Sequence, residues 1–333
     1  MILTRTPFRI SFFGGGTDYP QWYESYGGKV LAATIDKYCY ISVRELPPFF
    51  EHKFSIVYSR IENIDHINDI KHPAVREVLR YHNCKKGLVV KHDGDLPARS
   101  GLGSSSSFTV GLLNALSAFN GECIEKYKLA KTAIHVEQDL IKECVGSQDQ
   151  ISAAYGGVNE IEFYRDSDFS VVPLVISNTR LTQLNDHLML FFTGITRIAS
   201  EIAKSKVSNF GNNHSKLLRM RDMVDEGISI LRDKKIPIQE FGQLLHEAWT
   251  YKISLSEKVT SQDIDDIYKT ARDVGAIGGK ILGAGGGGFL LLFVNPNNQD
   301  KVRNALSKLV YVPFRFEYSG SQVVLSKSNG FHD

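Results

Sequence analysis

Residues 97–108, PARSGLGSSSSF, combine residue types that can hold a phosphate group. A helix that begins among Ser104, Ser105 and Ser106 would turn its free backbone N–H groups and its positive dipole end toward an anion. Gly101 and Gly103 would let the backbone come close to that anion. A Gly/Ser linker and an ordinary Ser-capped helix are the alternatives. The linker fits poorly, because a strand-like run precedes the segment and a helical apolar pattern follows it.

Two carboxylates lie farther along the chain. A helix is expected over about residues 125–144, and Glu137 falls on its apolar stripe. A carboxylate there needs a partner to offset its desolvation, so Glu137 either pairs with a buried Arg or Lys or binds magnesium. Asp149 is expected in the first turn of a short helix after Ser147. By itself, that position favours a charge that only stabilises the helix.

A second glycine-rich stretch, FRISFFGGGTDYP, spans residues 8–20 and indicates a strand that ends in a turn. Asp18 is either a turn residue or an acceptor for the hydroxyl groups of a polyhydroxylated ligand. Arg9 stands between Phe8 and Ile10 in the strand and could point outward to the surface.

The third stretch, KILGAGGGGF at residues 280–289, contains GxGxxG, yet the residues that follow, FLLLFV, indicate a strand. A dinucleotide site needs a helix at that point, so we expect a loop between two strands. Its glycines exceed what a hairpin requires, which favours close approach to a ligand or to another loop.

The composition argues against several classes of function. The 39 Lys and Arg residues nearly balance the 37 acidic residues, which gives no reason to expect a nucleic-acid or membrane-surface partner. The four cysteines form no CxxC pair, as expected for reduced thiols in a cytoplasmic protein. No apolar run approaches the ~20 residues of a membrane span. We therefore expect a cytoplasmic globular protein, with its oligomeric state left open.

The order of elements predicts two lobes. Strand-rich sequence dominates the first half, and residues 197–273 are almost entirely helical in pattern. We place the boundary so that residues 1–185 form the N-terminal lobe and residues 186–333 the C-terminal lobe. The fold class is α+β, and a cleft between two such lobes is a common place for a ligand.

Taken together and in this order, the three glycine-rich stretches resemble the motifs of the GHMP kinases, the superfamily of galactokinase, homoserine kinase, mevalonate kinase and phosphomevalonate kinase. The resemblance implies a two-lobed GHMP kinase fold, with a mixed-sheet N-terminal lobe that carries the nucleotide loop and a ferredoxin-like α/β C-terminal lobe. It also implies an ATP-dependent kinase that uses Mg²⁺.

The resemblance assigns roles to the candidate residues. The phosphates of ATP would lie on the loop formed by Ser100, Gly101, Leu102, Gly103, Ser104, Ser105 and Ser106. Ser105 and Glu137 would bind Mg²⁺, and Asp149 would accept the proton of the substrate hydroxyl, with Arg9 beside it. The substrate would contact the first and third motifs at Gly15, Gly16, Thr17, Asp18, Gly285, Gly286 and Gly287.

The first motif also bears on the substrate. Gly15 and Gly16 stand where galactokinases carry Glu-His, and GGGTD in a short chain resembles the D-glycero-D-manno-heptose 7-phosphate kinases and their fucokinase-like relatives. The resemblance implies a phosphosugar that is phosphorylated on its anomeric hydroxyl, in a route to GDP-heptose for surface polysaccharide. Arg197, with Thr193, is the candidate clamp for the sugar phosphate, and Arg99 and Lys280 are further candidates. A kinase for an unphosphorylated sugar and a non-catalytic sensor remain alternatives.

Overall fold

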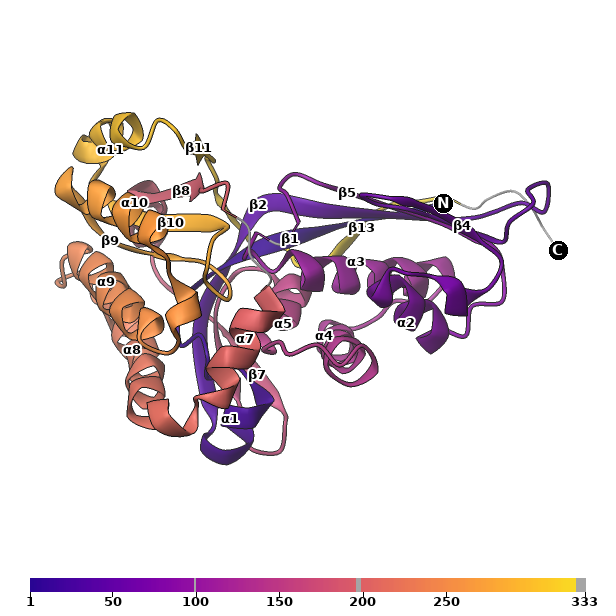
Figure 1. The fold of residues 1–333 in the computed structure, drawn as a ribbon, viewed down its shortest axis with the longest axis horizontal. Coiled ribbons are helices and arrows are strands. Elements are labelled where there is room, and N and C mark those ends of the chain that lie inside the picture. Colours follow the sequence, from indigo (N-terminus) through magenta and orange to yellow (C-terminus); the bar gives the residue numbers. More distant parts are fainter. Residues whose placement is uncertain (99, 196–198, 328–333) are drawn as a thin grey trace.

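The structure is a computed structural model that describes residues 1–98, 100–195 and 199–327, so Arg99 and Arg197 lie outside the described residues. Its elements form two lobes, each built on one sheet (Figure 1). The helices are α1 (Pro20–Tyr26), α2 (Pro73–Tyr81), α3 (Ser104–Phe119), α4 (Lys126–His135), α5 (Gln148–Tyr155), α6 (Asn178–His187), α7 (Ala199–Ser208), α8 (His214–Arg232), α9 (Gln239–Ile253), α10 (Gln262–Asp273) and α11 (Gln299–Ala305).

The first lobe contains a mixed sheet, in which β3 runs parallel to β5 and the other pairs are antiparallel. Its order is β13-β1-β2-β5-β3-β4, with β6 and β12 also paired to β2, and β7 to β6. Its strands are β1 (Ile2–Phe13), β2 (Gly28–Glu45), β3 (Phe54–Val57), β4 (Ile61–Ile64), β5 (Leu88–Gly94), β6 (Val158–Phe163), β7 (Phe169–Pro173), β12 (Phe316–Glu317) and β13 (Gln322–Ser326).

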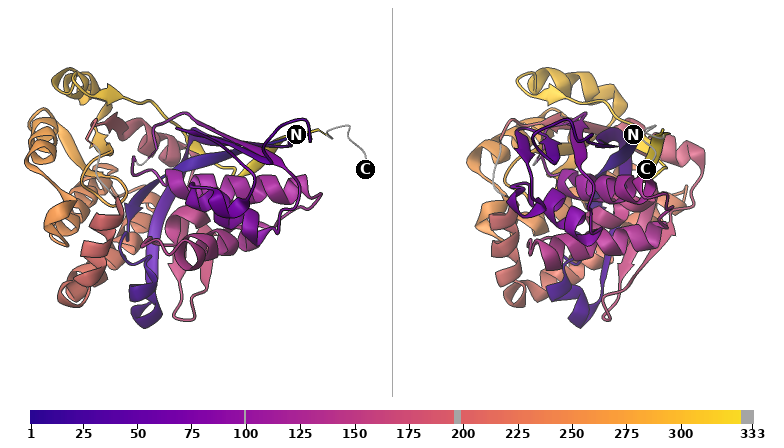
Figure 2. Two further views of the ribbon diagram at one scale, coloured as in Figure 1. Left: turned by 45° about the vertical axis from the view of Figure 1, so that its right-hand side comes forward. Right: turned by 90° about the vertical axis from the view of Figure 1, so that its right-hand side faces the viewer.

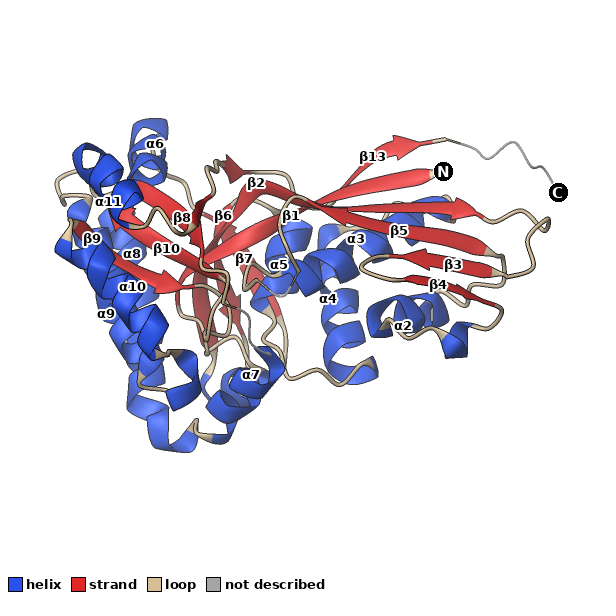
Figure 3. Cartoon of the chain, turned by 45° about the horizontal axis from the view of Figure 1, so that its top comes forward, coloured by secondary structure: helices blue, strands red, loops and turns tan. Residues whose placement is uncertain are grey.

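The second lobe has an antiparallel sheet of order β11-β8-β10-β9, and helices α8 to α11 belong to this lobe (Figure 3). Its strands are β8 (Leu188–Phe192), β9 (Ala276–Ile281), β10 (Phe289–Val294) and β11 (Val310–Tyr311). The adjacent strands β9 and β10 pair in register, so the GAGGGG segment is a loop between two strands, as predicted.

The long strand β1 is covered on both faces, and this explains why its polar residues are buried. Helices α3 and α5 pack on it from the first lobe, and α8 and α9 contact it from the second. Phe12 and Phe13 both meet the ring of Phe241 on α9, so one hydrophobic core runs through both lobes. Arg9 therefore does not reach the surface and is only 3% exposed.

The end of the described chain corrects the expected lobe boundary. Residues 186–333 do not stay in the second lobe, because β12 pairs with β2 and β13 pairs with β1 in the first sheet. Figure 2 shows the yellow C-terminal segment leaving the second lobe and crossing to the first. Short, turn-flanked strands such as these carry no sequence signal for the sheet that they will join.

The helix expected over residues 125–144 is also shorter than predicted. Regular α-helix ends at His135, and a single π-helical stretch, η2 (Val136–Leu140), follows it. Lys142 then adopts a left-handed backbone with φ of 63°, which ends the helix. Such π-bulges are frequent at functional sites, and this one carries Glu137. No helix in the described ranges is long and apolar enough to cross a bilayer.

Candidate active site

Arg9 and Asp149 form a bidentate ion pair where the first sheet meets α5. Arg9 Nε donates to Asp149 Oδ1 at 2.7 Å, and Nη2 donates to Oδ2 at 2.8 Å. Asp149 lies in the first turn of α5, as predicted, and a quarter of its side chain is exposed. The pair thus holds a carboxylate in a fixed orientation with one side open to a ligand.

The loop from Ser100 to Ser106 lies directly against this pair. The remaining guanidinium nitrogen of Arg9, Nη1, donates to the Gly101 carbonyl at 2.9 Å, and the Arg9 amide donates to the Leu102 carbonyl. The N-cap of α3 is Gly103 in a left-handed conformation, with no side-chain capping bond. A Cβ on Gly103 would lie 3.3 Å from Asp149 Oδ2. The loop and the ion pair therefore share one surface, and the N-cap residue, a glycine, has no side chain to cap the helix.

Glu137 contacts α3 through Ser106, the serine that follows the expected Ser105. Its Oε2 accepts hydrogen bonds from Ser106 Oγ at 2.9 Å and from Gln150 Nε2 at 2.5 Å. Ser105 is exposed, so the structure joins Glu137 to Ser106 where the sequence had suggested Ser105. A helix turns by about 100° per residue, which is why adjacent serines face different directions.

Among the residues that the structure describes, Glu137 forms no ion pair with an Arg or a Lys, so the expected alternative of a buried basic partner is not observed. Burial raises the pKa of Glu137 to about 7, and the hydrogen bonds it accepts oppose this rise. Its Oε1 is buried without a hydrogen-bond partner. An orphaned carboxylate oxygen next to a phosphate loop fits a hard cation such as Mg²⁺, which uses one or two carboxylates and takes its other ligands from water and phosphate.

The first motif forms a tight loop that packs on residues 146–148. Asp18 is 2% exposed, with Oδ1 accepting from the Gly16 amide and Oδ2 from Gln148 Nε2. Burial raises the pKa of Asp18, and these two bonds counteract the rise. The Thr17 hydroxyl donates to the Gly14 carbonyl, so Thr17 is occupied within the loop. Gly15 is the least constrained residue of the loop, with Ser11 Oγ and the Gln148 amide as its nearest contacts.

The third motif packs against neighbouring backbone segments and does not form an open surface. A Cβ on Gly285 would lie 2.8 Å from the Val259 carbonyl, and one on Gly287 would lie 2.3 Å from the Ile195 carbonyl. Gly286 donates its amide to Val259. The residues that touch the phosphate loop are Gly283 and Gly288, which the sequence did not single out. The excess of glycines predicted close approach either to a ligand or to another loop. These contacts show the close approach of another loop.

The contact between Gly283 and Gly101 yields a testable prediction. A Cβ at Gly283 would lie 2.5 Å from the Gly101 Cα, so Gly283→Ala must push the two loops apart. We expect kcat/KM to fall about 100-fold, because small displacements of phosphate-positioning groups are costly. Gly121→Ala is the matched control, since Gly121 also has a positive φ but has nothing within 4 Å of its Cβ position. Equal losses of activity in the two variants would contradict the role of this contact.

Three buried lysines lie around the glycine-rich first and third motifs. Of these, the sequence analysis named only Lys280, as a candidate for binding the sugar phosphate. Lys252 donates to the carbonyls of Ile281 and Gly283, each at 2.7 Å, and Lys280 donates to the Phe12 carbonyl at 2.8 Å. Lys206, on α7, is 5% exposed. Burial lowers the pKa of Lys280 to about 7, with Arg9 and Lys206 adding to the effect, and it lowers the pKa of Lys252 far below its usual value. The site therefore contains several buried basic side chains.

Thr193 also holds the glycine loop, because its hydroxyl donates to the Gly288 carbonyl at 2.8 Å. In the predicted phosphate clamp, the Thr193 hydroxyl is thus already bound to a backbone carbonyl. Its expected partner, Arg197, lies outside the described residues.

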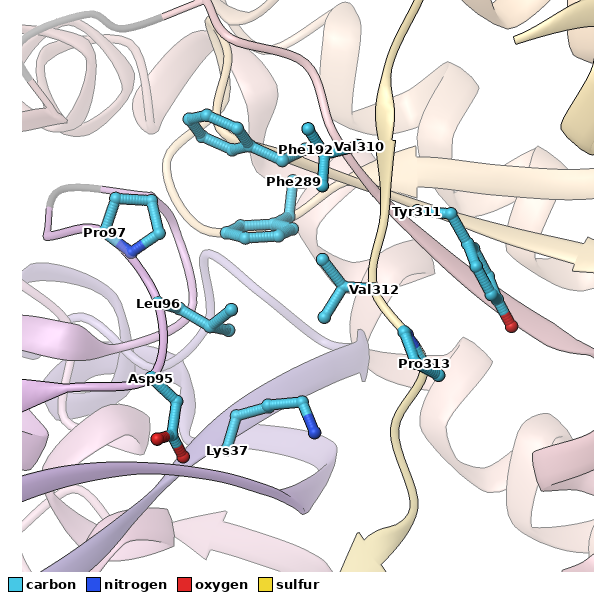
Figure 4. Close-up of a pocket in the computed structure, with 10 residues that line it drawn as sticks. All are labelled: Lys37, Asp95, Leu96, Pro97, Phe192, Phe289, Val310, Tyr311, Val312 and Pro313. Carbon is cyan, nitrogen blue, oxygen red and sulfur yellow. The ribbon is translucent and has the colours of Figure 1, made fainter. Parts of the chain in front are cut away.

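A separate hollow of about 610 Å³ opens between the lobes near the start of the phosphate loop (Figure 4). Apolar side chains dominate its lining, with Leu96, Phe192, Phe289 and Val312 facing it, and Lys37 and Asp95 lie at one side. None of the residues that line it belongs to the Arg9–Asp149 pair or to the Glu137 group.

Comparisons with known proteins identify the family to which the chain belongs. A family model for the GHMP kinases N terminal domain matches residues 68–157, and one for the GHMP kinases C terminal matches residues 234–312. The D-glycero-alpha-D-manno-heptose 7-phosphate kinase of Campylobacter jejuni is 34% identical over 321 residues, which cover 92% of this chain and 93% of that protein.

Solved structures match in fold. A D-glycero-D-manno-heptose 1-phosphate kinase from Bacteroides thetaiotaomicron has a TM-score of 0.80 at 23% identity, covering 98% of this chain and 100% of that one. The galactokinase of Lactococcus lactis, complexed with galactose, has a TM-score of 0.71 at 18% identity, covering 97% and 95%. At these identities the matches establish the two-lobed α+β fold.

Proposed function

The chain belongs to the GHMP kinases, and on that premise we propose that it transfers the γ-phosphoryl group of ATP to the anomeric hydroxyl of D-glycero-D-manno-heptose 7-phosphate. Membership makes it a small-molecule phosphotransferase. The observation that carries the chemistry is the Arg9–Asp149 pair, which Arg9 also ties to the Gly101 carbonyl of the phosphate loop. The heptose phosphate is supported by the 34% identical relative of that name.

The proposed reaction needs positioning and charge neutralisation more than covalent chemistry. The uncapped start of α3 and the loop before it would hold the phosphates of ATP. The Asp149 carboxylate would orient the anomeric hydroxyl and accept its proton as the oxygen bonds to the γ-phosphorus. The bond between that phosphorus and the bridging oxygen then breaks, and ADP leaves. Arg9 holds Asp149 in place through its two hydrogen bonds.

Magnesium would be held by Glu137 together with a serine hydroxyl, and it would neutralise phosphate charge when bound. The partnerless Oε1 of Glu137 supports this role. The contact with Ser106 favours its hydroxyl over that of Ser105. We therefore expect Ser106→Ala to raise the magnesium concentration needed for half-maximal activity more than Ser105→Ala does.

The test is ADP release with ATP and Mg²⁺ over a panel of acceptors. The panel contains D-glycero-D-manno-heptose 7-phosphate, the same heptose without phosphate, mannose, fucose, galactose and mevalonate. We expect strong turnover only on the heptose phosphate. Preferred turnover on fucose or another free sugar would retain the kinase and overturn the proposed substrate. ATP binding without turnover of any acceptor would instead favour the sensor.

A further inference from the structure

Lys206 is a buried cation that the proposed chemistry does not use. Its side chain is 5% exposed and its ammonium lies 5.7 Å from the centroid of the Tyr19 ring. Among the residues that the structure describes, this ammonium makes no hydrogen bond or ion pair, although Lys252 and Lys280 each donate to backbone carbonyls. An ammonium on a largely buried side chain, with no protein partner, is well placed to bind an anionic ligand.

The placement of α7 turns Lys206 toward the first motif. Ala203 and Phe210 pack in one hydrophobic cluster with Tyr19 and Trp22 of the first lobe and with Leu217 of α8. In Figure 1, α7 accordingly appears next to α1, to the right of α8 and α9 of the second lobe. The helix is thus fixed across the sugar-side loop, with Lys204 exposed to solvent and Lys206 directed inward.

The neighbours of Lys206 show where in the site it lies. Its ammonium is next to the ring of Tyr19, the residue that follows Asp18 in the first motif. Burial lowers the pKa of Lys206, and the carboxylate that opposes this most is Asp18, with Asp149 also contributing. Lys252, by contrast, is held by backbone carbonyls, because it donates to Gly283, which contacts Gly101.

We propose that the Lys206 ammonium binds the phosphate group of the sugar substrate and so selects a phosphosugar over a free sugar. This inference rests on the proposed function, in which Asp149 takes the anomeric hydroxyl. The phosphate of a heptose 7-phosphate is at the opposite end of the sugar, and Lys206 lies beside the first motif, with its ammonium 5.7 Å from the centroid of the Tyr19 ring. A charge-assisted bond from a desolvated ammonium to phosphate is among the stronger polar contacts in proteins.

The experiment compares heptose 7-phosphate with unphosphorylated heptose as acceptors in wild type, Lys206→Met, Lys206→Arg and Lys204→Met. Methionine keeps the length and the apolar stem of the buried lysine. We expect Lys206→Met to raise the KM for the phosphosugar about 10- to 100-fold, the usual range for a hydrogen bond to a charged group. Turnover of unphosphorylated heptose and the KM for ATP should stay within about threefold. Lys206→Arg should recover part of the loss, and Lys204→Met should resemble wild type.

Titration calorimetry with heptose 7-phosphate in the absence of ATP measures the same contact without turnover, and thermal melts confirm that each variant is folded. If wild type prefers the phosphosugar and Lys206→Met keeps that preference, the role of Lys206 is wrong and the proposed function stands. Equal losses on both acceptors, or a raised KM for ATP, would also overturn it. A wild type with no preference for the phosphosugar would overturn the substrate and the phosphate contact together.

Discussion

Asp149→Asn is expected to lower kcat by about 1,000-fold, within the range for loss of a positioned general base. The asparagine keeps the shape of the side chain but loses its negative charge and one of its two acceptor oxygens. Arg9, which is 3% exposed, then keeps its bond to the Gly101 carbonyl and loses the bidentate pair. Steady-state ADP release on the preferred acceptor measures the effect.

The affinity of Asp149→Asn for ATP distinguishes loss of the phosphoryl-transfer step from distortion of the loop at residues 100–106. We expect the dissociation constant for ATP to change by less than about threefold, since the side chain of Asp149 is bound by Arg9 and the bond from Arg9 to the Gly101 carbonyl is kept. Asp139→Asn is the matched control, because the Asp139 side chain is 67% exposed and pairs with His135 on the surface. A kcat for Asp149→Asn within tenfold of the control would show that Asp149 is not the base.

Glu137→Gln is expected to lower activity at physiological magnesium by about 100-fold, because loss of a metal-held charge removes several kcal/mol of transition-state stabilisation. The amide has nearly the same volume and still has an oxygen for Ser106 and Gln150 to approach. It cannot supply the negative charge that a divalent cation requires. A magnesium titration of the rate should show half-maximal activity shifted to a higher concentration.

The stability of the same variant gives an independent check. Glu137 is 1% exposed, and burial raises its pKa to about 7, so its ionised form destabilises the fold when no cation is present. Glu137→Gln should therefore melt no lower than wild type in metal-free buffer. Glu125→Gln, at an exposed position just before α4, serves as the control for both measurements. Unchanged magnesium dependence in Glu137→Gln would exclude it as a ligand.

The local parts of this site were predictable from sequence. Glycine runs, a serine-rich helix start and a carboxylate on an apolar stripe each reflect constraints that act within a few residues. The structure accordingly contains α3 from Ser104, a buried Glu137, and Asp149 in the first turn of α5. The resemblance to GHMP kinases, made on the three ordered motifs, is confirmed by the family matches and by the fold.

Contacts between distant parts of the chain were not predictable in the same way. Arg9 had an outward surface position as an open alternative, because nothing near it reveals that helices of both lobes cover β1. The choice of Ser106 over Ser105 depends on the rotation of α3 against η2, and the inward direction of Lys206 depends on where α7 docks. Such facts arise from tertiary packing, which no local pattern records.

The return of β13 to the edge of β1 has a consequence for how the protein is made. Ile2 pairs with Ser326, so the first sheet joins segments of the chain that are synthesised far apart in time. During translation, the outer edge of β1 stays without its neighbour until residue 326 has emerged, while all of the second lobe is being produced. An uncovered strand edge is a template for pairing with other chains. A stalled or proteolysed chain that ends after β11 would therefore be prone to aggregate, even though the three glycine-rich stretches, Arg9 and Asp149 had already been made.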